Sequence, residues 1–179
     1  MAELEKKDGA KIKTVARVAK FPTREAYEAA VKSGLLDKII QQEVKVEGVE
    51  VTRVDGNILL NEGINQGIWP LVAGASGVTP YNNANAKLGV GDGDTPESAT
   101  QTDLQGTNKL YKGMDSGYPT YGTDQKIVFR ATFNENEANW TWNEWSISNT
   151  ANVNLNRKVA NLGTKNGGVW VLEASLQLS

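Results

Sequence analysis

Residues 125–148 constrain the fold more than any other stretch, because a two-residue alternation is followed there by three of the chain's five tryptophans. In the first half, apolar side chains recur at every second position, at Ile127, Phe129, Ala131 and Phe133. Such a period places one set of side chains against a core and the other toward solvent. The pattern predicts a strand that ends near Phe133.

The second half contains a mismatch of parity. Trp140 and Trp142 are at even positions, whereas Trp145 and Ile147 are at odd ones, so an unbroken strand would send them to opposite faces. One extra residue near Asn143 would restore the inward set, which predicts a β-bulge at that point. Because tryptophan buries so much apolar area, we expect the two strands to form a hairpin at the centre of the core. The fold class is therefore predicted to be mainly β, an antiparallel β-sandwich or jelly-roll-like domain.

Further elements follow from the same patterns. Thr23 can cap a helix whose apolar stripe is interrupted at Gly34, which predicts two short pieces. A second helical pattern covers residues 57–72, although its glycines and Pro70 weaken it. The last strand places Trp170, Leu172, Ala174, Leu176 and Leu178 on one face and is expected to be a core strand. The other predicted strands are residues 43–47, 49–54, 84–91, 108–114 and 153–159.

The first 20 residues show neither helical nor strand periodicity and carry many lysines. They predict an extended N-terminal arm that docks on another protein; a functionless terminus is an equally good interpretation. Extended, about 20 residues reach ~66–70 Å, far beyond the ~16 Å radius of gyration of a globule of this length. The arm residues expected to contact a partner are Lys11, Ile12, Lys13, Val15, Arg17, Val18, Lys20 and Phe21. The predicted organisation is an arm at 1–22, a helix and hairpin attachment at 23–56, and a β-sandwich at 57–179.

Composition excludes several classes of function. With no cysteine and no histidine, the chain lacks thiolate nucleophiles, imidazole bases and the usual ligands of transition metals. A net charge of −2 argues against a dedicated nucleic-acid binder. No apolar run approaches the roughly 20 residues of a membrane helix, and the N-terminus does not resemble a signal peptide. We therefore expect no cofactor, no nucleic-acid or membrane partner, and synthesis and use without export.

Carboxylates are the remaining acid–base groups, chiefly Glu135, Glu137 and Glu144. A glycosidase needs two carboxyl groups about 5–10 Å apart across a cleft. Acids in a turn, such as Glu135 and Glu137, are usually solvated charges. The chain is therefore predicted not to be an enzyme.

Two loops offer binding hypotheses. Asp92, Asp94 and Glu97 are oxygen donors in a tight turn and could hold an ion, but the simpler interpretation is a turn followed by a short helix that begins at Thr95. Tyr118 and Tyr121 lie in a loop rich in glycine and proline, where aromatic faces could stack on a sugar.

An ordered series of short motifs runs through about residues 57–179. The motifs are LNEGI (60–64), NNANA (82–86), LGVGD (88–92), TQTDLQG (100–106), FRATF (129–133), WNEW (142–145), LNRKV (155–159) and LGTK (162–165). Together they resemble a family of tailed-bacteriophage virion structural proteins.

The resemblance implies a virion role. The expected function is that of a head decoration, or cementing, protein that is made in the host cytoplasm and binds the outer capsid surface. Its expected partners are the major capsid protein and itself, as a homotrimer, with the basic arm attracted to an acidic shell. The alternative is a tail-fibre or receptor-binding module that holds a host glycan through Tyr118 and Tyr121.

Overall fold

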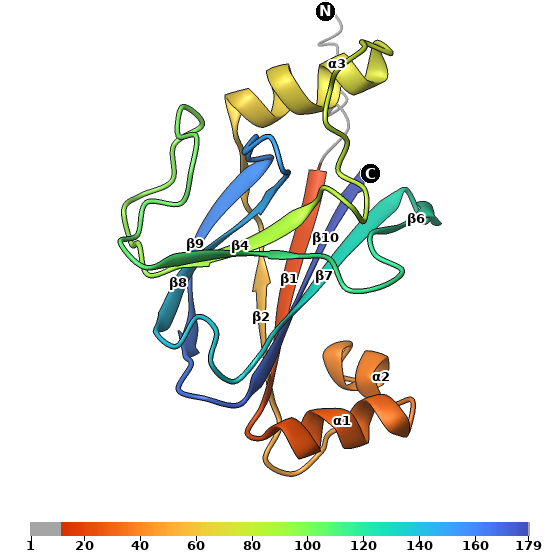
Figure 1. Ribbon diagram of the computed structural model, residues 1–179, viewed down its shortest axis with the longest axis vertical. Helices are drawn as coiled ribbons and strands as arrows, with labels where there is room; N and C mark the ends of the chain where they lie inside the picture. Colours follow the sequence, from red (N-terminus) through yellow and green to blue (C-terminus); the bar gives the residue numbers. More distant parts are fainter. Residues whose placement is uncertain (1–11, 179) are drawn as a thin grey trace, which may run out of the picture.

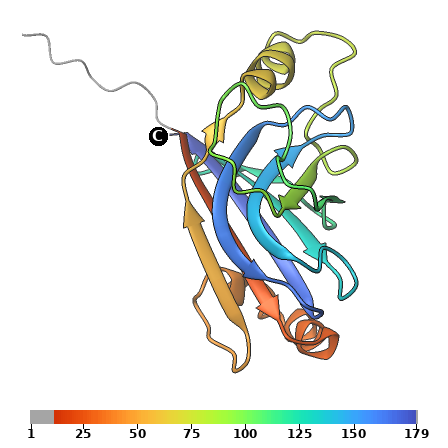
Figure 2. The ribbon, with the colours of Figure 1, turned by 90° about the vertical axis from the view of Figure 1, so that its left-hand side faces the viewer.

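Ten strands form two five-stranded antiparallel sheets in the computed structural model, which describes residues 12–178. Sheet I has the strand order β2-β1-β10-β7-β6, and sheet II has the order β3-β9-β8-β4-β5. The sheets lie face to face (Figures 1 and 2), so the predicted mainly β sandwich is confirmed. Sheet I consists of β1 (Ile12–Phe21), β2 (Glu50–Asp55), β6 (Thr120–Thr123), β7 (Lys126–Phe133) and β10 (Val169–Leu178). Sheet II consists of β3 (Ile58–Leu59), β4 (Lys87–Gly91), β5 (Lys109–Gly113), β8 (Thr141–Ser148) and β9 (Asn156–Thr164).

The core between the sheets is built around aromatic side chains. Trp142 of β8 lies edge-on to Phe133 and to Trp170, with ring centroids 4.8 Å apart in each pair. Its indole Nε1 donates to the carbonyl oxygen of Ala138 over 2.8 Å, so the buried polar atom of this ring is satisfied. The inward alternation predicted for β7 is confirmed, because Phe129, Ala131 and Phe133 are all buried.

The strands β7 and β8 do not form the predicted hairpin. β7 pairs with β10 and β6 in sheet I, whereas β8 pairs with β4 and β9 in sheet II. Residues 134–140 therefore cross from one sheet to the other, and the two strands meet through their side chains across the core. The predicted bulge is confirmed, because the register of β8 against β9 shifts between Trp142 and Glu144.

The expected extended arm is wrong for the part of it that the structure describes. β1 lies between β2 and β10 in sheet I, and Val15, Val18 and Phe21 are buried within the protein's own fold. These side chains cannot contact a partner, and Lys20 forms an ion pair with Glu50 at 3.0 Å. Ile12, Lys13 and Arg17 retain exposed surface, while Lys11 lies outside the described residues. Because β1 and β2 complete sheet I, the boundary at residue 56 does not separate an attachment from the sandwich either.

Two short helices cover one end of the outer face of sheet I. As predicted, α1 (Arg24–Lys32) is capped by Thr23, whose Oγ1 accepts from the N–H of Ala26 at 3.2 Å, and the helical segment breaks at Gly34, whose φ is +70°. α2 (Leu36–Ile40) follows at once. A second apolar cluster lies beneath these helices and comprises Ala19, Phe21, Ala30, Ile39, Ile40, Val169 and Val171.

The opposite end is closed by a different helical segment (Figures 1 and 2). The predicted helix over 57–72 is divided into β3, the π-helix η1 (Gly63–Ile68) and α3 (Trp69–Val72). Gly63 is required there, because a Cβ would lie 2.5 Å from the Cα of Leu155. Residues 43–47, expected to be a strand, form turns and bends, and no helix follows Thr95. None of the helices in residues 12–178 is long and apolar enough to span a membrane.

Candidate docking site

An apolar groove of about 770 Å³ opens at the end of the sandwich that carries η1 and α3. Side chains from both sheets line it, together with α3 and the loops 80–83 and 117–119. The groove is lined by Ile12, Leu59, Ile68, Leu71, Pro80, Tyr81, Asn82, Asn83, Gly117, Tyr118, Pro119, Tyr121, Gly122, Gln125, Lys126, Ile127, Phe129, Leu155, Leu176, Gln177 and Leu178. A volume of this size falls within the range of ligand and peptide sites.

The floor of the groove is a continuation of the core. Along the inward face of β10, Leu172 and Ala174 are fully buried, Leu176 is half-buried, and Leu178 is 54% exposed. Ile12 is paired with Leu178 on the neighbouring strand and is 43% exposed. The inward-facing side chains of β1 and β10 thus continue beyond the part of sheet I that sheet II covers. Those at the ends of the two strands are apolar and open to solvent.

The helical wall is held close to the loop at residues 80–83. At Gly67 a Cβ would lie 2.6 Å from the Oη of Tyr81, so only glycine fits without a shift of that ring. The Tyr81 hydroxyl donates to the carbonyl oxygen of Val153 over 3.1 Å. Burial raises the pKa of the Tyr81 phenol above its usual value. The groove wall is therefore preformed by packing and by a partly buried hydrogen bond.

Large exposed apolar side chains concentrate around this groove. Six of the eight such residues in the described chain lie in its lining or on α3, and only Val31 and Val46 lie elsewhere. The six are Ile12 (43% exposed), Leu71 (38%), Leu178 (54%), Trp69 (59%), Val72 (74%) and Tyr121 (80%). Single exposed apolar residues are ordinary, but a contiguous group marks an interaction surface. The concentration identifies this end as the candidate docking site.

The two tyrosines predicted as a glycan platform lie at the rim of the groove. Tyr121 is open to solvent, but the ring of Tyr118 covers the guanidinium of Arg130, with 4.4 Å between the Cζ atom and the ring centroid. Burial raises the pKa of Tyr118 to about 12. The nearby amide of Asn83 is used internally, since its Nδ2 donates to the carbonyl oxygens of Asp115 and Tyr118. Of the two tyrosines, only Tyr121 therefore keeps an open aromatic face, and the amide of Asn83 is not available to a sugar.

A smaller polar depression of about 220 Å³ lies on the outer face of sheet I, next to the groove. Arg130 is buried there and donates to Glu173 over 2.6 Å and to Asp37 of α2 over 2.7 Å. Arg17 and Lys126 also line the depression, and within residues 12–178 neither forms an ion pair. Three cationic side chains thus face two carboxylates, which leaves a local excess of positive charge.

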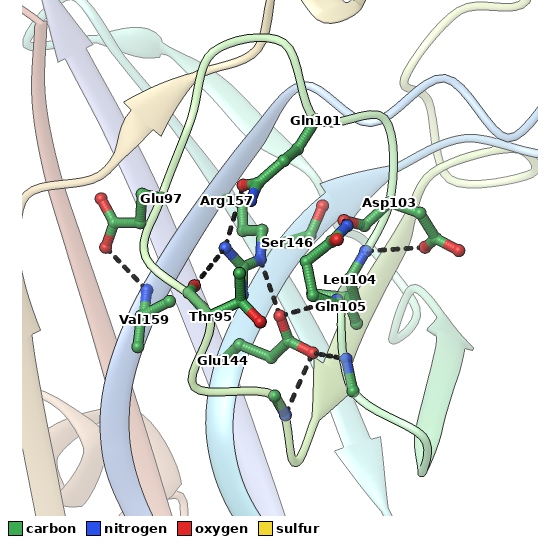
Figure 3. A network of polar contacts seen from close by, with 12 residues as sticks. Thr95, Glu97, Gln101, Asp103, Leu104, Gln105, Glu144, Ser146, Arg157 and Val159 are labelled. Atoms are coloured by element: carbon green, nitrogen blue, oxygen red, sulfur yellow. Dashed lines mark hydrogen bonds and ion pairs between the residues drawn. The ribbon is translucent and has the colours of Figure 1, made fainter.

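The three candidate catalytic carboxylates do not meet in one cleft. Glu144 is fully buried, and its Oε2 accepts from the Nε of Arg157 over 2.7 Å. Backbone N–H groups of the loop 92–107 surround the same carboxylate (Figure 3). The donors are Gly93 at 3.3 Å, Gln105 at 3.0 Å and Gly106 at 2.7 Å. Glu135 instead pairs with Arg24 and Glu137 with Lys112, so all three groups have structural partners.

The carboxylates of the loop 91–97 also point to separate partners. Asp92 accepts from the N–H and the side-chain amide of Asn108, whereas Glu97 accepts from the N–H of Val159 and pairs with Lys158. Across residues 12–178 there is no group of three or more acidic side chains placed to hold a metal ion. These acids fasten the loop to its neighbours.

The groove was not expected from the sequence. The available signal was that the inward face of the last strand remains apolar through Leu178, and that a Trp-Pro-Leu-Val run follows a glycine-rich helix. Comparison with protein-family models, with curated proteins and with solved structures gave no match. The functional assignment therefore depends on the geometry of the groove and on the motifs in the sequence.

Proposed function

We propose that this chain is a non-enzymatic structural protein of a bacteriophage virion, a head decoration protein that binds the outer capsid surface and stabilises the shell. The motif resemblance supports the virion role. The groove supports binding to another protein as the basis of this role, because four exposed apolar side chains line it and two more lie on α3, one of its walls. The attachment surface is the groove and its rim, in place of the N-terminal arm.

The rigidity of the scaffold agrees with such a role. The groove is built on strand ends of sheet I and on a helix packed by Gly63 and Gly67, so the docking surface is formed before a partner arrives. A preformed apolar surface loses little conformational entropy on binding. Repetition over a symmetric shell, or within the expected homotrimer, multiplies a modest affinity per copy.

The experiment that tests this proposal has two parts. Mass spectrometry and immunogold labelling of particles released from cells that carry this sequence should find the protein on heads. Purified protein should then bind heads that lack it, and Tyr121→Asp should reduce that binding at least tenfold because it places a charge at the rim. Val31→Asp, the same kind of change on α1 at the other end of the molecule, is the matched control and should bind normally.

The tail-fibre alternative remains a second candidate because of one observation, the 80% exposure of Tyr121 at the rim. It predicts labelling of tails and a signal on a glycan array that Tyr121→Ala abolishes. Labelling of heads with no glycan signal would reject it. Absence of the protein from purified particles would reject both virion roles.

A further inference from the structure

The four sheet edges of the sandwich differ in how well they are protected from added strands. Edge strands usually carry charged residues or are very short, because an open edge can pair with another chain. β2 carries Glu50, Arg53 and Asp55, β5 carries two lysines, and β3 is only two residues long. β6, with the sequence Thr-Tyr-Gly-Thr, has no charge, and all four of its residues are exposed. Of the edges described, β6 is the longest one without a charged side chain, although it is short and its register against β7 shifts between Tyr121 and Thr123.

β6 also borders the groove. Tyr121 and Gly122 line it, and Tyr121 is paired with Ile127 of β7, another lining residue. A strand added beside β6 would continue the inner face of sheet I, so every second side chain would point toward the groove. A four-residue edge spans about 13 Å, enough for about two inward side chains. Because the lining is largely apolar, these side chains are expected to be apolar.

The other face of an added strand would border the polar depression. Thr120 lies on that face, opposite Val128, and lines the depression together with Lys126 and Arg17. Lys126 is opposite Thr123 of β6 and forms no ion pair within residues 12–178, whereas Arg130 is already compensated by Glu173 and Asp37. Arg17 lies on β1, beyond β7 and β10, and is out of reach of a strand added at β6. The unmatched positive charge favours acidic side chains at the outward positions of the incoming strand.

We infer that the edge of β6 binds an extended segment of a partner protein as an additional strand of sheet I, with apolar side chains in the groove alternating with acidic side chains beside Lys126. Binding of this kind obtains affinity from main-chain hydrogen bonds and specificity from pockets for alternate side chains. The inference rests on the proposed function, since it names the chemistry of the segment that the docking site accepts.

The test uses the full chain and a fluorescein-labelled, acetylated peptide of four Glu-Leu repeats, with binding followed by fluorescence anisotropy. Saturable binding is expected, and Tyr121→Asp and Lys126→Glu should each weaken it at least tenfold. Val31→Asp and Lys32→Glu on α1 are the matched controls and should leave it unchanged. Circular dichroism of each variant verifies that the sandwich is intact.

Further peptides separate the contribution of main-chain hydrogen bonds from that of the acidic side chains. Two peptides, one N-methylated at every leucine and the other at every glutamate, retain the side chains but each lose the main-chain donors of one strand edge. One of the two should lose binding, and equal binding by both would overturn strand addition. A Lys-Leu repeat should bind at least tenfold more weakly, and equal binding would overturn the acidic preference.

The remaining outcomes distinguish this inference from the proposed function. Head binding that depends on Tyr121, without peptide binding, would retain the decoration role and reject the added strand. If the protein binds the peptide but is absent from particles, the added strand is retained and the decoration role is rejected. Self-association that Tyr121→Asp abolishes, with no peptide binding, would assign the groove to a second copy of the chain and overturn the inference.

Discussion

The Nε of Arg157 donates to Oε2 of Glu144 over 2.7 Å, and both side chains are completely buried beneath the loop 92–107 (Figure 3). The same guanidinium donates through its Nη1 to the carbonyl oxygen of Thr95 and to the side chain of Gln101, each over 2.9 Å. One ion pair thus connects two strands of sheet II to a long loop that has no regular secondary structure of its own.

Glu144→Gln should therefore destabilise the protein by about 3–5 kcal/mol, because it leaves Arg157 buried without its counter-charge. Urea denaturation measures the change. Glu144→Gln combined with Arg157→Met should cost less than the sum of the two single changes, since the pair is coupled. Asp55→Asn, which breaks the exposed pair with Arg53, is the control and should leave the unfolding midpoint unaltered. Equal effects at the two sites would contradict the structural role of the buried pair.

Phe21→Ala should cost about 3–5 kcal/mol, because Phe21 is fully buried and packs edge-on against Tyr27 at 5.6 Å between centroids. Ile12→Ala on the same strand is the comparison and should change stability by about 0.5 kcal/mol or less. Thermal and urea unfolding test both variants. A small effect of Phe21→Ala would revive the interpretation of this segment as an arm.

Gly93→Ala should destabilise the protein by about 1–3 kcal/mol through overpacking. A Cβ at this position would lie 2.5 Å from the backbone nitrogen of Gly106 and 2.6 Å from Oε1 of Glu144. Gly113→Ala is matched to it, because a Cβ there meets nothing within 4 Å. The control variant should keep or slightly raise the unfolding midpoint, and a similar loss in both would show that the close approach at Gly93 is unimportant.

Stability should fall as the pH is lowered from about 5 to about 3, in part through Asp92. Hydrogen bonds from the side chain and backbone of Asn108 lower the pKa of the Asp92 carboxyl below its usual value. The folded protein therefore binds this proton less readily than the unfolded chain, so the stabilisation is present above the ordinary aspartate pKa and is lost on acidification. Asp92→Asn should flatten this part of the urea-midpoint profile, and Asn108→Ala should do the same. If the dependence of the urea midpoint on pH is unchanged in both variants, Asp92 does not contribute to the loss of stability in acid.

Sequence patterns predicted those strands whose two faces differ. Phe129, Ala131 and Phe133 alternate with polar residues because only one side of β7 meets the core, and the parity mismatch around Asn143 located the bulge in β8. The pairing of strands was not predictable in this way. A turn-like segment at 134–140 suits a hairpin and a crossing between sheets equally well.

β1 was missed because apolar residues occur at both of its parities. Ala16 and Val18 face the core between the sheets, while Ala19 and Phe21 on the other face pack under α1 and α2. Burial on both sides removes the alternation from which a strand is recognised. The groove was missed because it depends on how far sheet II covers sheet I. That is a property of tertiary packing and leaves no local pattern in the sequence.

The pairing of Ile12 with Leu178 has a practical consequence. Ile12 and Leu178, the two ends of the described chain, both line the groove, so an affinity tag or a fluorescent protein joined directly at either of these residues would crowd that surface. The turns at residues 43–49, beside α1 and α2 at the far end of the sandwich, offer an insertion point for a label or a displayed peptide that leaves the groove unobstructed.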